Sequence, residues 1–329
     1  MTPLAPHLAA FIRDHLPRDR GCSQHTCEAY AYAFRLLLGF AAERCHTSPS
    51  SLTLEQLDAP LVTAFLEHVE TARGNSPATR NARLAAIKSF AHFVEYRVPS
   101  AIEQVGRILA IPSKKTDQTL IDYLDRKELQ ALLDVPDPTT REGTRDRAML
   151  HVGFAAGLRV SELVGLQLRD LKTHPQASIH VCGKGRRERV LPLWKETARS
   201  LRAWVALRGE PRATELFLNA QGGPLTRSGF EYILRKYVKR AAHTCPSIAA
   251  KRVSPHVLRH SCAMHVLQAT RDVRRVALWL GHASVKSTEI YLRADPTEKL
   301  AALEAGTAPS LRSGSFKAPD RLLAMLHPN

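Results

Sequence analysis

The sequence predicts a mostly α-helical protein with a small β-sheet, arranged in two domains. Three observations lead to this class. Apolar residues recur at helical spacing along most of the chain, one short segment has the pattern of a β-hairpin, and a polar stretch without periodicity separates the two parts. At 329 residues the chain is long enough for two domains, each with its own core.

Residues 1–110 are predicted to form a helical domain. Over residues 23–43 the apolar positions 30, 34, 37, 38 and 41 have helical spacing, and a second helix is expected over 60–73. A third begins at Ser76, which can cap it, with Pro77 at the first helical position. Basic side chains in and just before this helix fit either a solvated face or phosphate contacts. They are Arg73, Arg80, Arg83 and Lys88.

Residues 111–120, "IPSKKTDQTL", are polar, contain proline and lack any period, so they are predicted to be the linker. The second domain is expected over 121–305. Its first helix has a start signal, because Asp125 is followed three residues later by Glu128. Residues 306–329 form a tail in which "DRLLAML" has the pattern of a short amphipathic helix. A disordered terminus is the other interpretation of the tail.

The stretch "ASIHVCGKGRRERVLPL" contains two strand-like runs around a Gly-Lys-Gly turn, which predicts a β-hairpin. Helices are then expected over 195–208, 226–242, 255–269, 272–280 and 284–304.

The chain is strongly basic, with 47 Lys and Arg against 31 Asp and Glu, a formal net charge of +16. Residues 1–116 carry 13 basic and 10 acidic side chains, whereas the remainder carries 34 and 21. Such an excess favours an anionic partner, most often a nucleic acid. We expect the anion to bind mainly to the C-terminal two thirds.

Several classes of protein are excluded by what the sequence lacks. The longest apolar runs are far shorter than the roughly 20 residues of a membrane span, and the N-terminus does not resemble a signal peptide. The six cysteines include no Cys-x-x-Cys pair, so neither a disulfide framework nor a zinc knuckle is indicated. A cytoplasmic location without membrane association is therefore expected.

Residues 256–260, in the stretch "SPHVLRHSCAMHVL", place an arginine between two histidines on one expected helix. His256 and His260 have a spacing that zinc can use, but such sites carry a carboxylate where this chain has Val257. Arg259 opposes a cation and favours an anion, and His256 can exchange a proton near neutral pH. We therefore expect anion binding and no metal. An exposed arginine between two hydrogen-bonded histidines fits this pentapeptide as well.

Two more basic groups could take part in the chemistry of a site. In "AAGLRVSELVGL", Arg159 follows a glycine turn and Glu162 stands one helical turn later, where it can orient the guanidinium. Lys184 occupies the hairpin tip, where a flexible ammonium can deliver a proton to a leaving oxygen. Arg186 and Arg187 follow it and are expected to contact DNA. For Arg159 the alternative is an ordinary surface salt bridge with Glu162. For Lys184 it is a basic hairpin tip that only contacts the DNA backbone.

The stretch "LWLGHASVKSTEIYLRAD" contains His282 after a glycine and Tyr291 nine residues later. A tyrosine hydroxyl, with a pKa of about 10, is a poor nucleophile unless cations stabilise its anion and the phosphate it attacks. Arg159, Arg259 and His282 are suited to that task. A core tyrosine with its hydroxyl pointing outward is the alternative.

In this order, the motifs "GLRVSEL", "GKGRRER", "HVLRH", "LGHAS" and "STEIYLRAD" closely resemble the signature of the tyrosine recombinases, the phage integrase family. The resemblance is strong over residues 120–300. Residues 1–110 are similar, more loosely, to the SAM-like core-binding domain of that family. The fold implied for the second domain is that of DNA breaking-rejoining enzymes. The sequence departs from the pattern at "QATRD", where many members have a glycine turn, and residues 306–329 match no family motif.

The resemblance implies a site-specific recombinase or integrase that cleaves DNA through a 3′-phosphotyrosyl intermediate and a Holliday junction. The catalytic residues implied are Arg159, Lys184, His256, Arg259, His282 and Tyr291. Arg159 and Arg259 would hold the nonbridging oxygens, Lys184 would act as general acid, and His256 would be the acid/base partner of Tyr291. No metal, ATP or other cofactor and no small-molecule substrate is implied. The partners implied are double-stranded DNA and three further copies of the chain, which form a homo-tetramer on the DNA. Related recombinases could take the place of some copies.

Two functions of other classes compete with this interpretation. A DNA-binding regulator could keep the fold without cleaving, and a type IB topoisomerase shares the phosphotyrosyl chemistry but relaxes supercoils without defined sites. The sequence leaves three biological roles open: phage integration, transposon movement, and dimer resolution.

Overall fold

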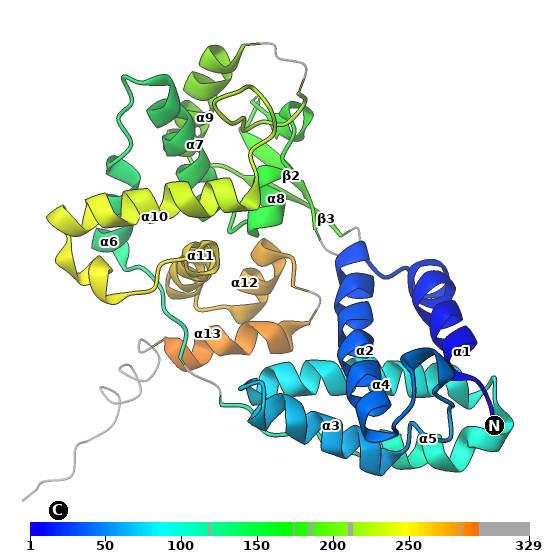
Figure 1. Ribbon diagram of the computed structural model, residues 1–329. Helices are drawn as coiled ribbons and strands as arrows, with labels where there is room; N and C mark the ends of the chain where they lie inside the picture. Colours follow the sequence, from blue (N-terminus) through cyan, green and yellow to red (C-terminus); the bar gives the residue numbers. More distant parts are fainter. Residues whose placement is uncertain (118–119, 174, 184–186, 210–212, 283, 296–329) are drawn as a thin grey trace, which may run out of the picture. The chain divides into compact units, whose positions relative to one another are not determined.

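The computed structural model describes residues 1–329 except 118–119, 174, 184–186, 210–212, 283 and 296–329. The chain divides into two compact units, Met1–Gln118 and Thr119–Asn329. Within the described residues the first unit is helical, and the second is helical with one three-stranded sheet (Figure 1). The predicted class, mostly α with a small sheet, is confirmed.

The first unit is built from five α-helices and a π-helical segment in its described part. These are α1 (Leu4–Ala10), the π-helix Phe11–Asp19, α2 (Gln24–Arg44), α3 (Ala59–Thr71), α4 (Pro77–Glu95) and α5 (Ile102–Leu109). Ser76 caps α4 by accepting a hydrogen bond from the Thr79 amide, and Pro77 is the first helical residue, as the sequence predicts. Phe11, Phe34, Phe90 and Phe93 pack ring against ring at the centre of this unit.

The predicted linker begins as part of the first unit. The Arg80 guanidinium donates to the carbonyl of Pro112 at 2.9 Å, and the Asn81 side chain bonds both the amide and the carbonyl of Lys114. These bonds fix residues 112–114 against α4.

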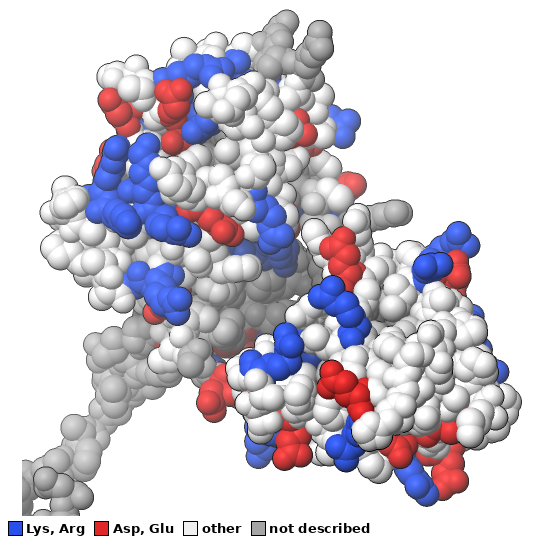
Figure 2. Space-filling view, viewed as in Figure 1, with Lys and Arg blue, Asp and Glu red and all other residues white. Residues whose placement is uncertain are grey.

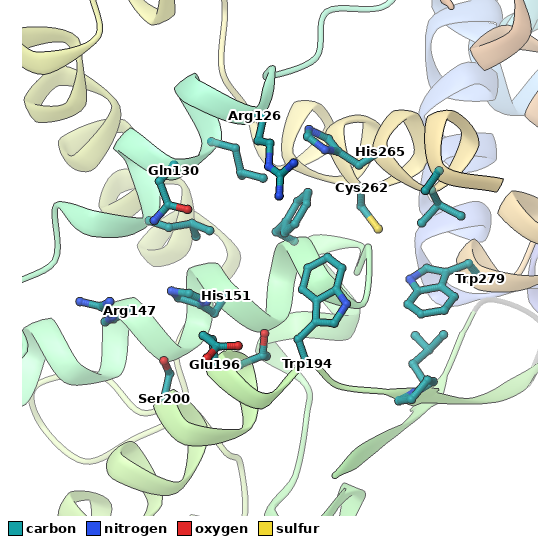
Figure 3. A pocket seen from close by; sticks show the side chains of 18 of the residues that line it. Arg126, Gln130, Arg147, His151, Trp194, Glu196, Ser200, Cys262, His265 and Trp279 are labelled. Atoms are coloured by element: carbon teal, nitrogen blue, oxygen red, sulfur yellow. The ribbon is translucent and has the colours of Figure 1, made fainter. Parts of the chain in front are cut away.

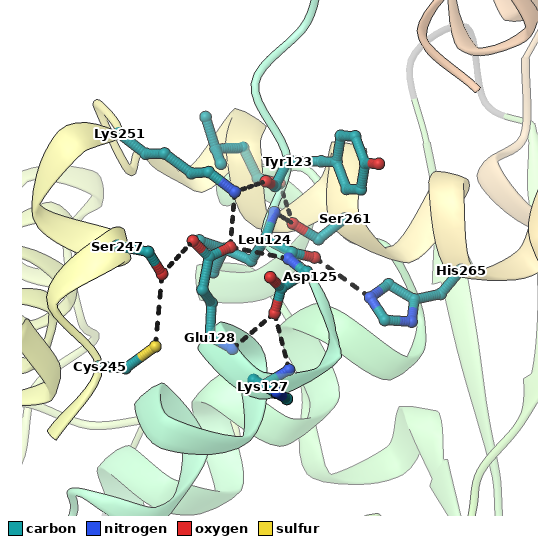
Figure 4. Close-up of polar contacts among 11 residues, drawn as sticks. Tyr123, Leu124, Asp125, Lys127, Glu128, Cys245, Ser247, Lys251, Ser261 and His265 are labelled. Carbon is teal, nitrogen blue, oxygen red and sulfur yellow. Dashed lines mark hydrogen bonds and ion pairs between the residues drawn. The ribbon is translucent and has the colours of Figure 1, made fainter. Parts of the chain in front are cut away.

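The first residues of the second unit are held by a network of hydrogen bonds and an ion pair, shown in Figure 4. Asp125 caps α6 and Glu128 bonds back to the Asp125 amide, which confirms the predicted helix start. The buried Glu128 carboxylate also accepts from Lys251 at 2.6 Å and from Ser247 at 2.8 Å. Because Lys251 lies just before α11, these bonds hold the start of the unit against the helix that carries His256 and Arg259.

The α-helices of the second unit pack mainly against one another. They are α6 (Arg126–Asp134), α7 (Arg141–Ala155), α8 (Val160–Val164), α9 (Lys195–Arg208), α10 (Arg227–Thr244), α11 (Pro255–Thr270), α12 (Val273–Leu280) and α13 (Glu289–Ala294). α7 packs against α9 and α11, and α10 packs against α6 and α8 (Figure 1).

The predicted hairpin is present as β2 (Ser178–Cys182) and β3 (Glu188–Pro192), paired antiparallel with Val181 opposite Arg189. A short third strand, β1 (Leu171–Lys172), which we did not predict, pairs with the other edge of β2.

Two helix ends differ from the sequence-based expectations. α11 ends at Thr270, and Arg271 after it takes the left-handed conformation (φ 50°) that a glycine would adopt more easily. The expected helix 284–304 begins with a 3₁₀ turn, Val285–Thr288, before α13, and residues beyond Asp295 lie outside the described part.

Candidate active site

A tight turn between α7 and α8 presents Arg159. Gly157 has φ +55°, and a β-carbon there would lie 2.6 Å from the Leu280 side chain, so only glycine fits. Arg159 follows at the start of α8. Its amide and its guanidinium donate to the two oxygens of Glu162 at 3.0 and 2.8 Å. The buried carboxylate therefore fixes the direction of the Arg159 side chain.

Arg259 on α11 is 4% exposed and joins two turns. Its guanidinium donates to the carbonyl oxygen of Gly157 and, at 2.8 Å, to that of Leu280. It lies 3.9 Å from Glu162. Burial and the charge of Arg159 lower the pKa of Arg259 to about 10, so it remains a cation at neutral pH.

Tyr291 on α13 is 2% exposed and packs among Met264, Leu267 and Leu280. Its hydroxyl is 3.0 Å from Nδ1 of His260. Burial raises the pKa of Tyr291 to about 12, although the charges of Arg259 and Arg159 act to lower it. The tyrosine and both guanidinium groups thus share one electrostatic environment.

His282 follows the glycine turn that ends α12. Its ring lies parallel to that of Tyr291, with centroids 6.4 Å apart, and its Nδ1 is 2.7 Å from the buried hydroxyl of Thr288. Burial, with the charges of Arg259 and Arg159, lowers the pKa of His282 to about 4. The imidazole is therefore neutral at pH 7.

The histidine next to the tyrosine hydroxyl is His260 and not His256. His256 is exposed one helical turn earlier, with its ring centroid 6.4 Å from that of His260. Burial and the nearby His256 and Arg259 lower the pKa of His260 to about 4. Sequence analysis considered His260 only as a possible zinc ligand beside His256 and assigned it no catalytic role. Its place in the His-x-x-Arg-His run was the one available signal.

Lys184 and Arg186 lie outside the described residues, and Arg187 is exposed at the start of β3. The structure thus brings together Arg159, Glu162, Arg259, His282 and Tyr291, adds His260, and leaves His256 at the surface nearby. Within the described residues, no group of three or more His, Cys, Asp or Glu side chains is placed to hold a metal ion.

Comparison with known proteins identifies the family of the chain. Residues 122–298 match the phage integrase family, and residues 9–97 match the phage integrase N-terminal SAM-like domain. The chain belongs to the phage integrase family. The predicted family is therefore confirmed, and the protein is a tyrosine-type site-specific DNA recombinase.

Relatives within the family span nearly the whole chain. A Sinorhizobium fredii protein described as an integrase/recombinase is 43% identical over 98% of each chain. The tyrosine recombinase XerC of Myxococcus xanthus is 36% identical, covering 88% of this chain and 94% of its own.

Solved structures show the same fold. The integrase of transposon Tn1549 bound to transposon right end DNA has a TM-score of 0.69 at 16% identity, covering 89% of this chain and 97% of its own. A lambda integrase tetramer bound to a Holliday junction has a TM-score of 0.61 at 14% identity, covering 88% and 77%.

One of the arginines predicted to contact DNA is instead structural. Arg80 is 6% exposed and its guanidinium is engaged with Pro112 and Asn81, so the prediction of a phosphate contact is corrected. Arg73 is exposed, Lys88 is half-buried, and Arg83 stacks its guanidinium over the Tyr32 ring at 4.8 Å.

A basic helix face that sequence reasoning missed lies on α10 (Figure 2). Its exposed residues Arg235, Lys236, Lys239 and Arg240 recur at one helical turn. The spacing "RKYVKR" was visible in the sequence and would have indicated this face.

No helix in the described ranges is long and apolar enough to cross a membrane.

The two buried histidines predict a loss of stability in acid. Their pKa values of about 4 lie below the ordinary 6.5, so the unfolded chain binds more protons between these values and stability falls as pH drops through them. We expect Tm to fall by about 3 °C or more from pH 7 to pH 5, since 1 kcal/mol corresponds to roughly 2–4 °C. Thermal unfolding of a His260→Asn/His282→Asn variant should show a shallower pH dependence. The exposed His25→Asn is the control. Identical slopes in all three proteins would contradict this assignment.

Proposed function

We propose that this recombinase cuts DNA by direct attack of Tyr291 on a phosphodiester. The bond from the tyrosine oxygen to phosphorus forms as the bond to the 5′-oxygen breaks, which leaves a 3′-phosphotyrosyl protein and a free 5′-hydroxyl. The observation that carries the proposal is that the buried Tyr291 hydroxyl lies 3.0 Å from His260, the neighbour of Arg259 on α11, where the charges of Arg259 and Arg159 act on it. Two fixed cations can offset the charge that develops on the nonbridging oxygens without a metal ion.

The other groups are assigned to proton transfer and hydrogen bonding. His282 donates a hydrogen bond to the phosphate, and Lys184 protonates the departing 5′-oxygen. The neutral His260 holds the hydroxyl in its buried position before attack. The exposed His256, one turn earlier on α11, is then the acid/base partner. When a 5′-hydroxyl from another duplex attacks the phosphotyrosine, strands are exchanged.

DNA affinity comes from both domains in this proposal. Residues 1–110 form the core-binding domain, 111–120 the linker and 121–305 the catalytic domain. The phosphate contacts assigned are Arg73, Arg83, Lys88, Arg186 and Arg187, to which the exposed face of α10 is added. A protein that acts on chromosomal or plasmid DNA is expected in the bacterial cytoplasm.

A pool of nicked duplexes with randomised sequence tests this function. The nick lets the short fragment that carries the free 5′-hydroxyl diffuse away, so the phosphotyrosyl adduct accumulates and its DNA can be sequenced. A site-specific recombinase gives adducts enriched for one sequence, and two duplexes carrying that sequence then exchange strands through a four-way junction. Adducts without sequence enrichment, with relaxation of plasmids, indicate a topoisomerase. Specific binding without any adduct indicates a regulator.

We further propose that four copies assemble on two DNA sites, with each tail docking on a neighbour. A cavity of ≈ 1650 Å³ opens between α6, α7, α9, α11 and α12 (Figure 3). Four large apolar side chains at least half exposed line it: Val190, Trp194, Leu207 and Leu278. Buried polar atoms of His151 and Thr197, which also line it, have no hydrogen-bond partner among the residues that the structure describes. An incoming peptide segment supplies both apolar cover and hydrogen bonds.

The tail segment "DRLLAML" suits this cavity because its leucines recur at helical spacing. Deleting residues 306–329, or Leu278→Asp in the cavity, should lower synapsis of two sites at least tenfold and spare adduct formation on a single site. Ile102→Asp, which replaces an exposed apolar residue of the first unit, is the control. Gel-shift and crosslinking assays measure synapsis, and unchanged synapsis in the deletion variant removes the docking proposal.

A further inference from the structure

Arg189 on β3 holds the same carboxylate as Arg159. Its side chain is 9% exposed, and its guanidinium donates to both oxygens of Glu162, at 2.8 Å to Oε2 and 3.3 Å to Oε1. Glu162 itself is 4% exposed and bonds Arg159 at 2.8 Å. One buried carboxylate therefore joins the sheet to the start of α8, with a guanidinium on each side.

The Arg189 side chain also lies against two glycine turns. A β-carbon at Gly281, where φ is +65°, would lie 3.1 Å from Cδ and 3.2 Å from Nη1 of Arg189. A β-carbon at Gly183 would lie 3.4 Å from Nη1 of Arg189 and 3.1 Å from Glu162. These glycines directly precede His282 and Lys184 in the chain. Close approach of the guanidinium thus restricts the side chain that either glycine position could hold.

The charge of Arg189 acts on the same groups. Burial favours protonation of Glu162, but hydrogen bonds from Arg189 and Arg159 oppose it, and the pKa of Glu162 is lowered overall. Besides the larger effect of burial, Arg189 contributes to the lowered pKa values of Arg259 and His282. Loss of Arg189 would leave a buried carboxylate with one fewer partner.

We propose that Arg189 is a positioning residue for DNA cleavage. It acts through Glu162 on Arg159, and its side chain packs against Gly281, the residue before His282. This role rests on the proposed function and adds a residue to it. Arg189 touches no DNA in the proposal, because its guanidinium is used within the protein.

The test compares Arg189→Met with Arg202→Met, an exposed arginine of α9 that loses the same charge. Adduct formation is measured at saturating DNA, alongside DNA affinity and Tm. We expect Arg189→Met to slow adduct formation about 30-fold or more with affinity within threefold of wild type. Arg189→Lys should recover part of the rate, because an ammonium keeps the ion pair with one oxygen. Arg202→Met should match wild type.

Two further readouts separate positioning from general damage. Glu162 is faced by Arg159 from α8, Arg189 from β3 and Arg259 from α11. Without Arg189 it takes up a proton more easily, so the acid limb of the pH-rate profile should move to higher pH. Combining Arg189→Met with Glu162→Gln should slow cleavage little more than the worse single variant, since both act through one carboxylate.

The outcomes distinguish this inference from the proposed function. If wild-type protein forms no adduct, the proposed function fails. If wild type cleaves and folded Arg189→Met cleaves equally fast, Arg189 has no positioning role. Multiplicative effects in the double variant also overturn the inference. Should Arg189→Met fail to fold, Arg189→Lys decides, because a folded lysine variant with an unchanged rate and pH profile contradicts the proposal.

Discussion

Replacing Tyr291 with phenylalanine will abolish the covalent DNA adduct and leave DNA binding intact. The substitution removes one oxygen and keeps the ring that packs among Met264, Leu267 and Leu280. The nucleophile is lost, so we expect cleavage to fall by on the order of 10⁴-fold or more, with affinity within threefold. Denaturing gels of end-labelled nicked duplex from the adduct pool measure the adduct, and gel shifts measure affinity.

Tyr237→Phe is the matched control. Tyr237 is also buried, and its hydroxyl donates to Asp146 at 2.9 Å, so this variant loses a hydrogen bond in the same unit. It should retain adduct formation at a temperature where it is folded. Adduct formation by Tyr291→Phe at more than a few per cent of the wild-type rate would show that another side chain is the nucleophile.

Local signals made much of the fold and site predictable. Ser76-Pro77 and Asp125 with Glu128 begin helices as their side chains dictate, because capping involves residues three apart. The Gly-Lys-Gly turn between two strand-like runs predicted the hairpin, because a hairpin also joins residues that are close in the sequence. The Glu162 contact with Arg159 also spans three residues, and it could be inferred from spacing alone.

The remaining features depend on contacts between distant residues. Arg80 was assigned to DNA because helical spacing cannot reveal that the carbonyl of Pro112, 32 residues later, takes its guanidinium. His256 and His260 share a helix face, and which of them meets Tyr291 is decided by how α13 packs on α11. Arg189 received no role from the sequence, because its contact with Glu162 joins residues 27 positions apart and depends on how β3 packs.

The buried tyrosine creates a requirement that the arginines must meet. Desolvation raises the pKa of Tyr291 to about 12, so at neutral pH the hydroxyl keeps its proton and is a weak nucleophile. Among the charges that oppose this effect, Arg259 has the largest influence. The same guanidinium fixes the turns at Gly157 and Leu280, which lead to Arg159 and His282. Charge and geometry are therefore combined in one side chain.

Arg259→Lys should consequently slow adduct formation by on the order of 10²–10³-fold at pH 7 while DNA affinity changes little. A lysine keeps a positive charge, but one ammonium cannot bond the carbonyls of Gly157 and Leu280 and also reach a phosphate as a planar fork. Rates are measured on nicked duplex at saturating protein, and thermal unfolding establishes that the variant is folded.

The pH dependence of Arg259 variants separates its two roles. Arg259→Gln removes the charge, so the pKa of Tyr291 should rise further and the rate of adduct formation should keep increasing to higher pH than in wild type. Arg259→Lys retains charge near Tyr291 and should shift this profile less, although its rate remains low because the turns are no longer held together. Arg202→Lys, exposed on α9, should leave both rate and profile unchanged. If lysine restored the wild-type rate, the fixed geometry of the guanidinium would be irrelevant and charge alone would activate Tyr291.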